Sequence, residues 1–109
     1  MAEPTLTDIF GTGATQDATS ITIQKSSLPR LTASANNTSE SLLTAILLKA
    51  QVSLSQTSFD ANINQSIYVS AGFSSFTTRG VNNDFYRVDQ LIFNLAKVDT
   101  GSIIDPDDY

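Results

Sequence analysis

The residues of this chain that could carry chemistry are few, and the acidic C-terminal segment holds the densest group. Asp105, Asp107 and Asp108 stand close together in the sequence, and hard cations such as Ca²⁺ bind several carboxylates offered by one loop. A calcium loop also needs a glycine turn and a distal glutamate, and neither follows here. We therefore expect an acidic, solvated tail and no metal site.

A second candidate pair is Arg87 and Asp89, which are two residues apart and so share a face of any strand. An exposed ion pair, or a contact with a partner, fits this pair better than a catalytic dyad does. The chain has neither histidine nor cysteine, which removes the usual proton-transfer group, the common nucleophile–base pairs and most zinc sites. Gly11 and Gly13 do not complete a dinucleotide fingerprint, because no strand precedes them and no third glycine follows. We expect no catalytic residue and no cofactor, and thus a protein that is not an enzyme.

Composition narrows the class of partner. The chain has 109 residues, enough for one domain, and a net charge of −5 with only six lysines and arginines, dispersed along the sequence. Nucleic-acid binding needs a positive patch, so we expect no nucleic-acid partner. No apolar run reaches membrane-spanning length and the first residues lack the pattern of a signal peptide, which predicts a soluble protein made in the cytoplasm with no membrane partner. Charged residues make up only 16%, and a neutral polar surface suits packed contacts with another protein.

The element that must organise the fold is a helix over residues 37–54. Its apolar residues recur at helical spacing: Leu43, Ile46, Leu47, Ala50 and Leu54, widened by Leu42, Ala45 and Leu48. Asn37 or Thr38 can cap the first turn, and Glu40 stands at capping-box spacing from Asn37. We expect this amphipathic helix to give the strands around it a surface to pack on.

The N-terminal part predicts a short helical turn and one strand. Residues 1–4 are interpreted as a mobile arm, and residues 5–10 as a helical turn capped by Thr5, with Asp8 three positions on and Gly11 at its end. We expect Ile9 and Phe10 to dock this turn on a core or on a neighbouring subunit. Residues 11–19 are rich in turn formers and are interpreted as a flexible connector. Residues 20–25 alternate strictly and predict a half-buried strand with Ile21 and Ile23 on one face.

The part that follows the helix predicts β-structure after a polar connection. We expect Phe59 and Ile63 to anchor the connection over residues 55–65, and residues 66–71 to form a strand. Gly72 marks a bulge or bend, after which Phe73 and Phe76 are candidates for packing.

The longest predicted strand covers residues 85–96, after a turn over 79–84. It is apolar on both faces, so both faces have to be buried against something. The helix can pack on one face, and a second sheet layer or another molecule can pack on the other. The two faces carry Phe85, Leu91, Phe93 and Leu95 on one side and Tyr86, Val88 and Ile92 on the other. A helix over residues 91–98 is the alternative.

These elements predict an α+β fold, with one central amphipathic helix packed on a small antiparallel sheet and with extended arms at both ends. Residues 1–19 form the N-terminal arm and connector, 20–99 the body, and 100–109 the acidic C-terminal tail. That tail also carries Ile103, Ile104 and Tyr109. Apolar residues of this kind are unusual in a disordered tail, and we expect the segment to bind across a neighbouring molecule.

Four stretches carry a resemblance to small structural proteins of tailed bacteriophages, especially those that infect cyanobacteria. They are TLTDIFGTGATQDATSITIQKSSL, NNTSESLLTAILLKA, QSIYVSAGF and RGVNNDFYRVDQLIFNLAKVD with its DPDDY ending, and together they span most of the chain. The resemblance is one of overall pattern. It implies a cement (decoration) protein on the outside of an icosahedral capsid, with the major capsid protein and a second copy of itself, as a homodimer, for partners. The dominant central helix departs from trimeric decoration proteins with a β-tulip fold.

The interface predicted from this resemblance lies at the two arms and on the two-faced strand. Its residues are Leu6, Ile9, Phe10, Tyr86, Val88, Ile92, Ile103, Ile104 and Tyr109. Residues 1–10 and 103–109 are expected to clasp neighbouring subunits. A head–tail connector or tail-completion protein, a non-viral protein-binding module and, last, a hydrolase built on the aspartate cluster remain as alternatives.

Overall fold

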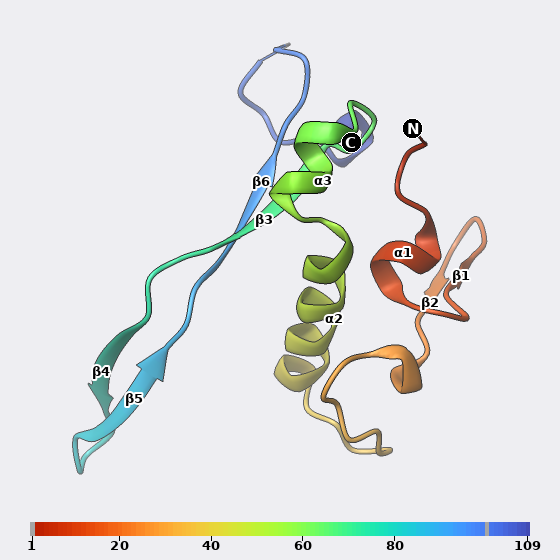
Figure 1. The fold of residues 1–109 in the computed structure, drawn as a ribbon. Coiled ribbons are helices and arrows are strands. Elements are labelled where there is room, and N and C mark those ends of the chain that lie inside the picture. The colour runs from red at the N-terminus through yellow and green to blue at the C-terminus, as the bar shows by residue number, and fades with distance from the viewer. Residues whose placement is uncertain (1, 100) are drawn as a thin grey trace.

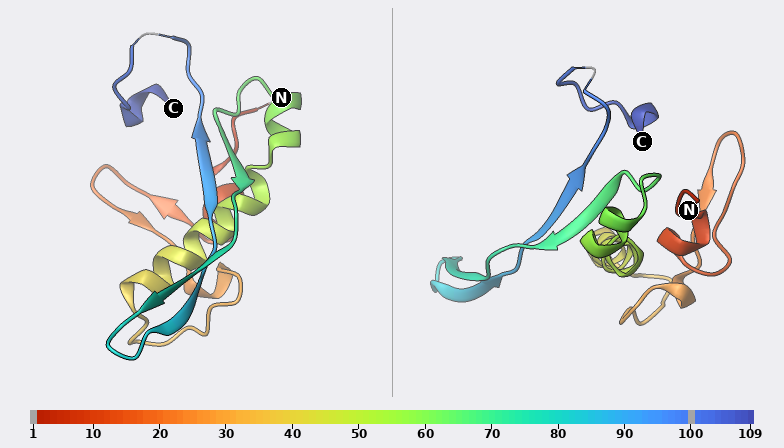
Figure 2. Two further views of the ribbon diagram at one scale, coloured as in Figure 1. Left: turned by 90° about the vertical axis from the view of Figure 1, so that its left-hand side faces the viewer. Right: turned by 45° about the horizontal axis from the view of Figure 1, so that its top comes forward.

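Helix α2 (Ser39–Ser53) runs through the middle of the molecule in the computed structural model, which describes residues 2–99 and 101–109. The N-terminal segment, with α1 (Leu6–Phe10), lies along one side of α2, and a long two-stranded ribbon lies on the other side and projects beyond it (Figure 1). Figure 2 gives two further views, one of which looks almost along α2 with the ribbon and α1 on opposite sides. Met1 and Thr100, which belong to the predicted arm and tail, lie outside the described residues.

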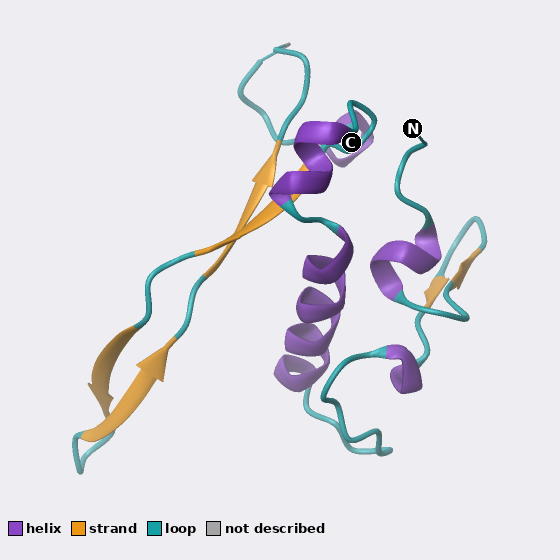
Figure 3. Ribbon diagram, in the orientation of Figure 1, coloured by secondary structure: helices purple, strands orange, loops and turns teal. Residues whose placement is uncertain are grey.

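Helices and small antiparallel sheets together form the predicted α+β fold (Figure 3). After α1 the chain forms β1 (Thr15–Gln16), β2 (Ile21–Thr22), the short 3₁₀ helix η1 (Lys25–Ser27), α2, α3 (Gln56–Ala61), β3 (Ile67–Ala71), β4 (Ser75–Arg79), β5 (Asp84–Val88), β6 (Leu91–Leu95) and a second 3₁₀ helix, η2 (Pro106–Asp108). The strands pair as β1–β2, β3–β6 and β4–β5.

The predicted central helix is confirmed, but its apolar stripe is only partly covered. Thr38 is the N-cap, because its hydroxyl accepts from the Ser41 amide at 3.1 Å, whereas the Asn37 side chain accepts from the Ser34 amide at 3.0 Å and forms no capping box. Ala45 and Ala50 are buried, while Leu43 is 55% exposed. The stripe is therefore wider than the surface that the rest of the chain offers it.

The predicted turn at the N-terminus is confirmed as α1, and it lies against α2. Thr5 and Asp8 form a capping box, in which the Asp8 amide donates to the Thr5 hydroxyl at 3.1 Å and the Thr5 amide donates to the Asp8 carboxylate at 2.9 Å. The carbonyl oxygen of Asp8 then accepts from Lys49 Nζ and Ser53 Oγ of α2. These two bonds and the apolar side of α1 hold the N-terminal segment on the helix.

The predicted connector over residues 11–19 is wrong in part, because it contributes a strand. β1 pairs with β2 in a small hairpin, with Gln16 opposite Ile21, and Asp17 holds the turn by accepting from the Thr19 and Ser20 amides, both at 2.9 Å. The strand predicted over residues 20–25 is shorter than expected, and Ile21 is 53% exposed. β2 has β1 as its partner strand, and the chain leaves it at once for η1, so Ile21 is not covered.

The polar connection after α2 folds as a further helix, α3, which sequence periodicity did not reveal. Ser55 caps it by accepting from the Ser58 amide at 3.1 Å. Phe59 anchors it as predicted, with its ring centroid 4.8 Å from that of Tyr68 on β3. Ile63 does not act as an anchor, since it is 97% exposed. The buried Gln65 amide group closes this corner by donating to the carbonyls of Ser55 and Ile67.

The ribbon is a single long antiparallel hairpin with a change of register in its middle. Ala71 pairs with Leu91, whereas Ser75 pairs with Val88, so three residues of the first strand lie opposite two of the second. This extra residue confirms the bulge predicted at Gly72. It also divides the long strand predicted over residues 85–96 into β5 and β6, and the helical alternative for 91–98 is wrong.

The hydrophobic core is small and lies where α2, α1 and the near half of the ribbon meet. Ala50, Leu54 and Val69 are buried there, and Ile9, Ile67 and Phe93 pack against them. The expected packing of Phe73 and Phe76 is wrong, because these side chains are 85% and 70% exposed on the projecting half of the ribbon. One face of β6 thus has the predicted helical cover, and the far half of the ribbon has no comparable cover.

The whole chain is more extended than a compact domain of its size. Its radius of gyration is 16.6 Å, against about 13 Å for a compact domain of roughly this length. The accessible surface is 8187 Å², which is about 2,300 Å² above the value expected for a compact monomer of this mass. Across the described residues, no helix has the length and apolar character needed to cross a membrane.

Candidate protein-binding surface

The acidic C-terminal residues do not converge on one point. Asp105 caps η2 by accepting from the Asp107 amide at 3.0 Å, while Asp108 accepts from Lys97 Nζ at 3.2 Å. In residues 2–99 and 101–109, no three aspartate or glutamate side chains gather closely enough to hold a metal ion. The carboxylates of this tail act as a helix cap and an ion-pair partner.

Arg87 and Asp89 form the ion pair that their spacing predicts. Arg87 Nε lies 2.9 Å from Asp89 Oδ1, and both side chains are more than half exposed. Ser74 Oγ lies between them, donating to Asp89 at 3.0 Å and accepting from Arg87 Nη2 at 3.0 Å. The hydrogen bond from Ser74, followed by that from Arg87, lowers the pKa of Asp89. An exposed pair of this kind contributes little stability, but the three side chains tie the two strands together at the bulge.

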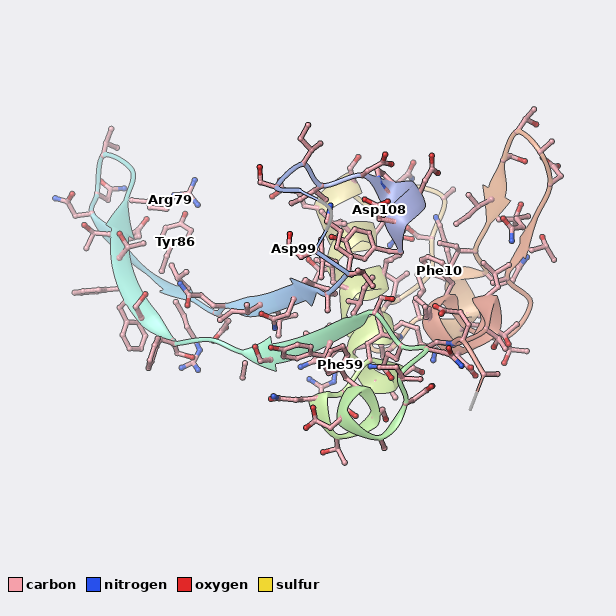
Figure 4. All side chains as sticks on the ribbon, turned by 90° about the horizontal axis from the view of Figure 1, so that it is seen from above. Phe10, Phe59, Arg79, Tyr86, Asp99 and Asp108 are labelled. Carbon is pink, nitrogen blue, oxygen red and sulfur yellow. The ribbon has the colours of Figure 1, made fainter. Side chains whose placement is uncertain are left out.

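The predicted interface residues of the N-terminal arm face the chain's own body. Leu6, Ile9 and Phe10 are each half-buried, and Ile9 packs against the central hydrophobic cluster. Figure 4 places Phe10 on the α1 side of the molecule, far from the ribbon tip. In this structure the apolar residues of the arm therefore stabilise the monomer.

The C-terminal residues divide into an inward and an outward group. Tyr109 is half-buried and shares a small hollow of about 30 Å³ with Pro4, Ile9 and Leu54, so the two chain ends meet there. Ile103 and Ile104 point outward and are 81% and 69% exposed. Lys97 holds this segment by donating to the Ile103 carbonyl at 2.6 Å, in addition to its ion pair with Asp108.

The predicted interface residues of the ribbon are partly exposed and lie apart from both chain ends. Tyr86, Val88 and Ile92 keep 44%, 38% and 44% of their surface accessible. The guanidinium of Arg79 lies over the Tyr86 ring, 4.8 Å from its centroid, and both side chains project from the side of the hairpin that faces the body (Figure 4). The structure thus brings Tyr86 and Val88 together on one face of β5 and brings Ile9 and Tyr109 together at one hollow. Ile103 and Ile104 form a separate exposed pair.

Sequence reasoning missed a group of strongly exposed apolar residues on the hairpin. Phe73, Phe76 and Phe85 are 85%, 70% and 83% exposed, and Val81 at the hairpin turn is 99% exposed. Every residue from 73 to 92 is exposed. The signal available in the sequence was that the far half of the hairpin has aromatic residues on both faces, while the single long helix is too short to cover its whole length.

Two open hollows flank α3 and complete the surface. One, of about 550 Å³, lies between the N-terminal segment and the α2–α3 corner and includes Val52 and Ala61 in its lining. The other, of about 630 Å³, lies between α3 and the end of the ribbon and includes Ile63, Ala96 and Val98. Their apolar lining suits contact with side chains of another protein.

Comparison with protein-family models, with curated proteins and with solved structures finds no match to this chain.

Proposed function

We propose that this chain is a structural protein of a tailed-phage particle, a cement protein that binds the outer surface of the icosahedral shell and stabilises joints between major capsid protein subunits. The observation that supports it most is the accessible surface of 8187 Å², about 2,300 Å² above that of a compact monomer. A standard protein–protein interface buries about 1,200–2,000 Å² in total. The excess surface is thus as large as the area that a standard interface buries. The sequence resemblance indicates the major capsid protein as the partner.

The distribution of exposed apolar residues supports contacts with more than one neighbour. The molecule measures 50 × 33 × 26 Å, and its exposed apolar side chains occur at separate places. Phe76 and Phe85 lie on the hairpin, Ile103 and Ile104 near the C-terminus, and Ile63 beyond α3. A protein that joins subunits has to bind on both sides of the joint, and separated apolar patches meet that requirement.

In this proposal the partners are the major capsid protein and a second copy of this chain, with neither nucleic acid nor membrane involved. The chain is made in the host cytoplasm and is carried on the exterior of the virion. Many copies bound around a symmetric shell multiply a modest local affinity, because each bound copy adds its own buried area to the assembly.

A head–tail connector or tail-completion protein is the second candidate within the particle. The projecting β4–β5 hairpin favours it (Figure 1), because subunits of a small ring can be joined by such an arm laid on the next copy. A protein-binding module outside any virus would use the same exposed surface. The number of copies per particle separates these candidates from a cement protein.

The test of the cement function is the heat resistance of particles with and without the chain. Particles lacking it are expected to release their DNA at a lower temperature, and adding the purified protein back should restore the wild-type value. Equal heat resistance with and without the chain would overturn the cement role.

The two predicted clasps can be tested in the same assay, but only the C-terminal one can be removed without disturbing the core. Because Ile9 packs on the core, deletion of residues 1–10 is expected to lower stability as well as binding. Ile103→Ser combined with Ile104→Ser removes exposed side chains only and should weaken binding to the shell without changing the melting temperature. If this variant and a deletion of residues 103–109 both bind like the wild type, the C-terminal clasp is wrong.

A further inference from the structure

We propose that two copies of this chain associate through the β4–β5 hairpin, with the face that carries Phe76 and Phe85 in one copy packed on the same face of the other. In the register of the hairpin Phe76 is paired with Arg87, and Phe85 with Thr78. These four residues therefore share one face. Tyr86 and Arg79 occupy the opposite face, which is turned toward the body, and aromatic rings project from the other side of the hairpin (Figure 4).

The first reason is the exposed aromatic area. Phe76 and Phe85 are 70% and 83% exposed, and Phe73 at the adjoining bulge is 85% exposed. At about 200 Å² for each phenylalanine, the three expose roughly 480 Å² in one copy and about 950 Å² in two. Together with the neighbouring Thr78 and the stem of Arg87, this area reaches the ~1,000 Å² that a specific interface needs.

The second reason is charge. It favours contact between two copies through this face over contact between them through other parts of their surfaces. The chain carries a net charge of −5, so two copies repel each other at most orientations. The hairpin segment from 73 to 92 is neutral, because Arg79 and Arg87 balance Asp84 and Asp89. On the aromatic face itself Arg87 is already paired with Asp89 at 2.9 Å. Two identical faces of this kind meet without a like-charge penalty.

The third reason is position. The hairpin projects from the body in Figure 1 and in the right-hand view of Figure 2, so a twofold contact at its aromatic face leaves α1, α2 and the C-terminal segment free. A dimer joined in this way forms without any shell protein. It is a closed arrangement, since the same patch is used on both copies.

The first experiment measures the oligomeric state of the full chain by sedimentation equilibrium over a wide range of concentration. The wild type is expected to dimerise, and Phe76→Ser combined with Phe85→Ser should weaken dimerisation at least about 100-fold, because buried aromatic anchors dominate interfaces. Val81→Ser, which removes an apolar side chain that is 99% exposed at the hairpin turn, is the matched control and should dimerise like the wild type. Circular dichroism and the melting temperature check that each variant keeps its fold.

The second experiment locates the contact with single cysteines, which is possible because the chain has none of its own. Thr78→Cys lies on the aromatic face and Thr77→Cys on the opposite face. A short bis-maleimide should join two copies of the Thr78→Cys protein and leave the Thr77→Cys protein monomeric. Three results would each overturn the dimer: a wild type that stays monomeric, a double-serine variant that still dimerises, or equal cross-linking at the two positions. A monomeric wild type would leave this face to a different protein.

Discussion

The backbone N–H of Gly72 donates to the carbonyl oxygen of Gln90 at 2.9 Å, at the point where the ribbon changes register. On one side of this bond β3 and β6 pack on α2, and on the other β4 and β5 project away from it (Figure 1). The extra residue of the bulge bends and twists the ribbon. The Gly72–Gln90 contact therefore separates the half of the ribbon that builds the core from the half that we expect to bind a partner.

Gly72→Ala should destabilise this junction. An added Cβ would lie 2.5 Å from Gln90 Cβ and 2.6 Å from its Oε1, closer than real side chains approach, so one strand has to move. We expect a loss of about 1–3 kcal/mol, the usual cost of overpacking, measured by thermal unfolding. Gln90→Gly in the same chain removes the clash and should recover part of the loss. A Gly72→Ala protein as stable as the wild type would show that the ribbon is not tightly joined here.

Leu54→Ala should cost about 2–4 kcal/mol of unfolding free energy, because it removes a buried side chain and leaves a cavity. Leu54 is 3% exposed and lies between Ala50 and Val69 in the central cluster. Val52→Ala is the matched control, since Val52 is 72% exposed two residues earlier and its loss should change stability by no more than about 0.5 kcal/mol. Urea unfolding monitored by circular dichroism gives both values. Equal effects of the two substitutions would mean that the core is placed elsewhere.

Lys97→Met should release the C-terminal segment without much effect on global stability. Lys97 Nζ donates to the Ile103 carbonyl at 2.6 Å and pairs with Asp108 at 3.2 Å. These contacts hold a segment that contributes no residue to the central hydrophobic cluster. The expected result is faster hydrogen exchange and proteolysis in residues 101–109 with a melting temperature close to that of the wild type. Asp107→Asn, which leaves the Lys97 contacts in place, is the control. Unchanged proteolysis in the Lys97→Met protein would mean that other contacts hold this segment.

Acid should weaken the fold through three carboxylates that cap or bridge backbone turns. Hydrogen bonds from the Thr5 amide lower the pKa of Asp8, those from the Thr19 and Ser20 amides lower the pKa of Asp17, and those from Ser74 and Arg87 lower the pKa of Asp89. Each carboxyl thus titrates below the usual range of an aspartate. A carboxyl whose pKa is lowered by folding stabilises the protein fully above its unfolded pKa. That stability is lost as the pH falls through the lower folded pKa.

The measurement compares the urea concentration at the midpoint of unfolding at about pH 7 with that at about pH 2.5. Asp17→Asn keeps an oxygen acceptor in the β1–β2 turn but cannot titrate, so its midpoint should fall less on acidification than that of the wild type. Glu40→Gln, at an exposed position on the first turn of α2, serves as the comparison and should behave like the wild type. An Asp17→Asn protein with the full wild-type loss would rule out this turn as a source of acid sensitivity.

Local signals in the sequence predicted most of the fold. Thr5 with Asp8, and Thr38 before an apolar periodic run, identified the caps of α1 and α2, and Gly72 identified the bulge. Phe59 was correctly expected to pack, but α3 was not predicted, because its sequence QTSFDA has a single apolar anchor and no helical stripe. Short helices of this kind depend on their cap and on tertiary contacts more than on periodicity.

The candidate surface was less predictable than the fold. Phe73 and Phe76 are of a residue type that is usually buried, and the alternation of apolar residues places them on strands. No local sequence feature shows that the ribbon extends past the helix on which it packs. For Ile9 the sequence left docking on a core or on a neighbouring subunit open, and the structure packs it on the core. Tyr109 was predicted to contact a neighbour because it lies in the C-terminal tail, and the structure places it against the body. Exposure depends on how helix and ribbon are arranged. The lengths of the elements in the sequence indicate that some apolar surface stays uncovered, but they do not say which residues form it.

The copy number of this chain in purified particles tests the proposal that it is a shell-binding component of a phage. Quantitative mass spectrometry can compare peptides of this chain with those of the major capsid protein, using labelled synthetic peptides as standards. A cement protein should be present in a copy number comparable with that of the shell protein. A handful of copies per particle would indicate a connector, and the absence of the chain from the particles would contradict the claim.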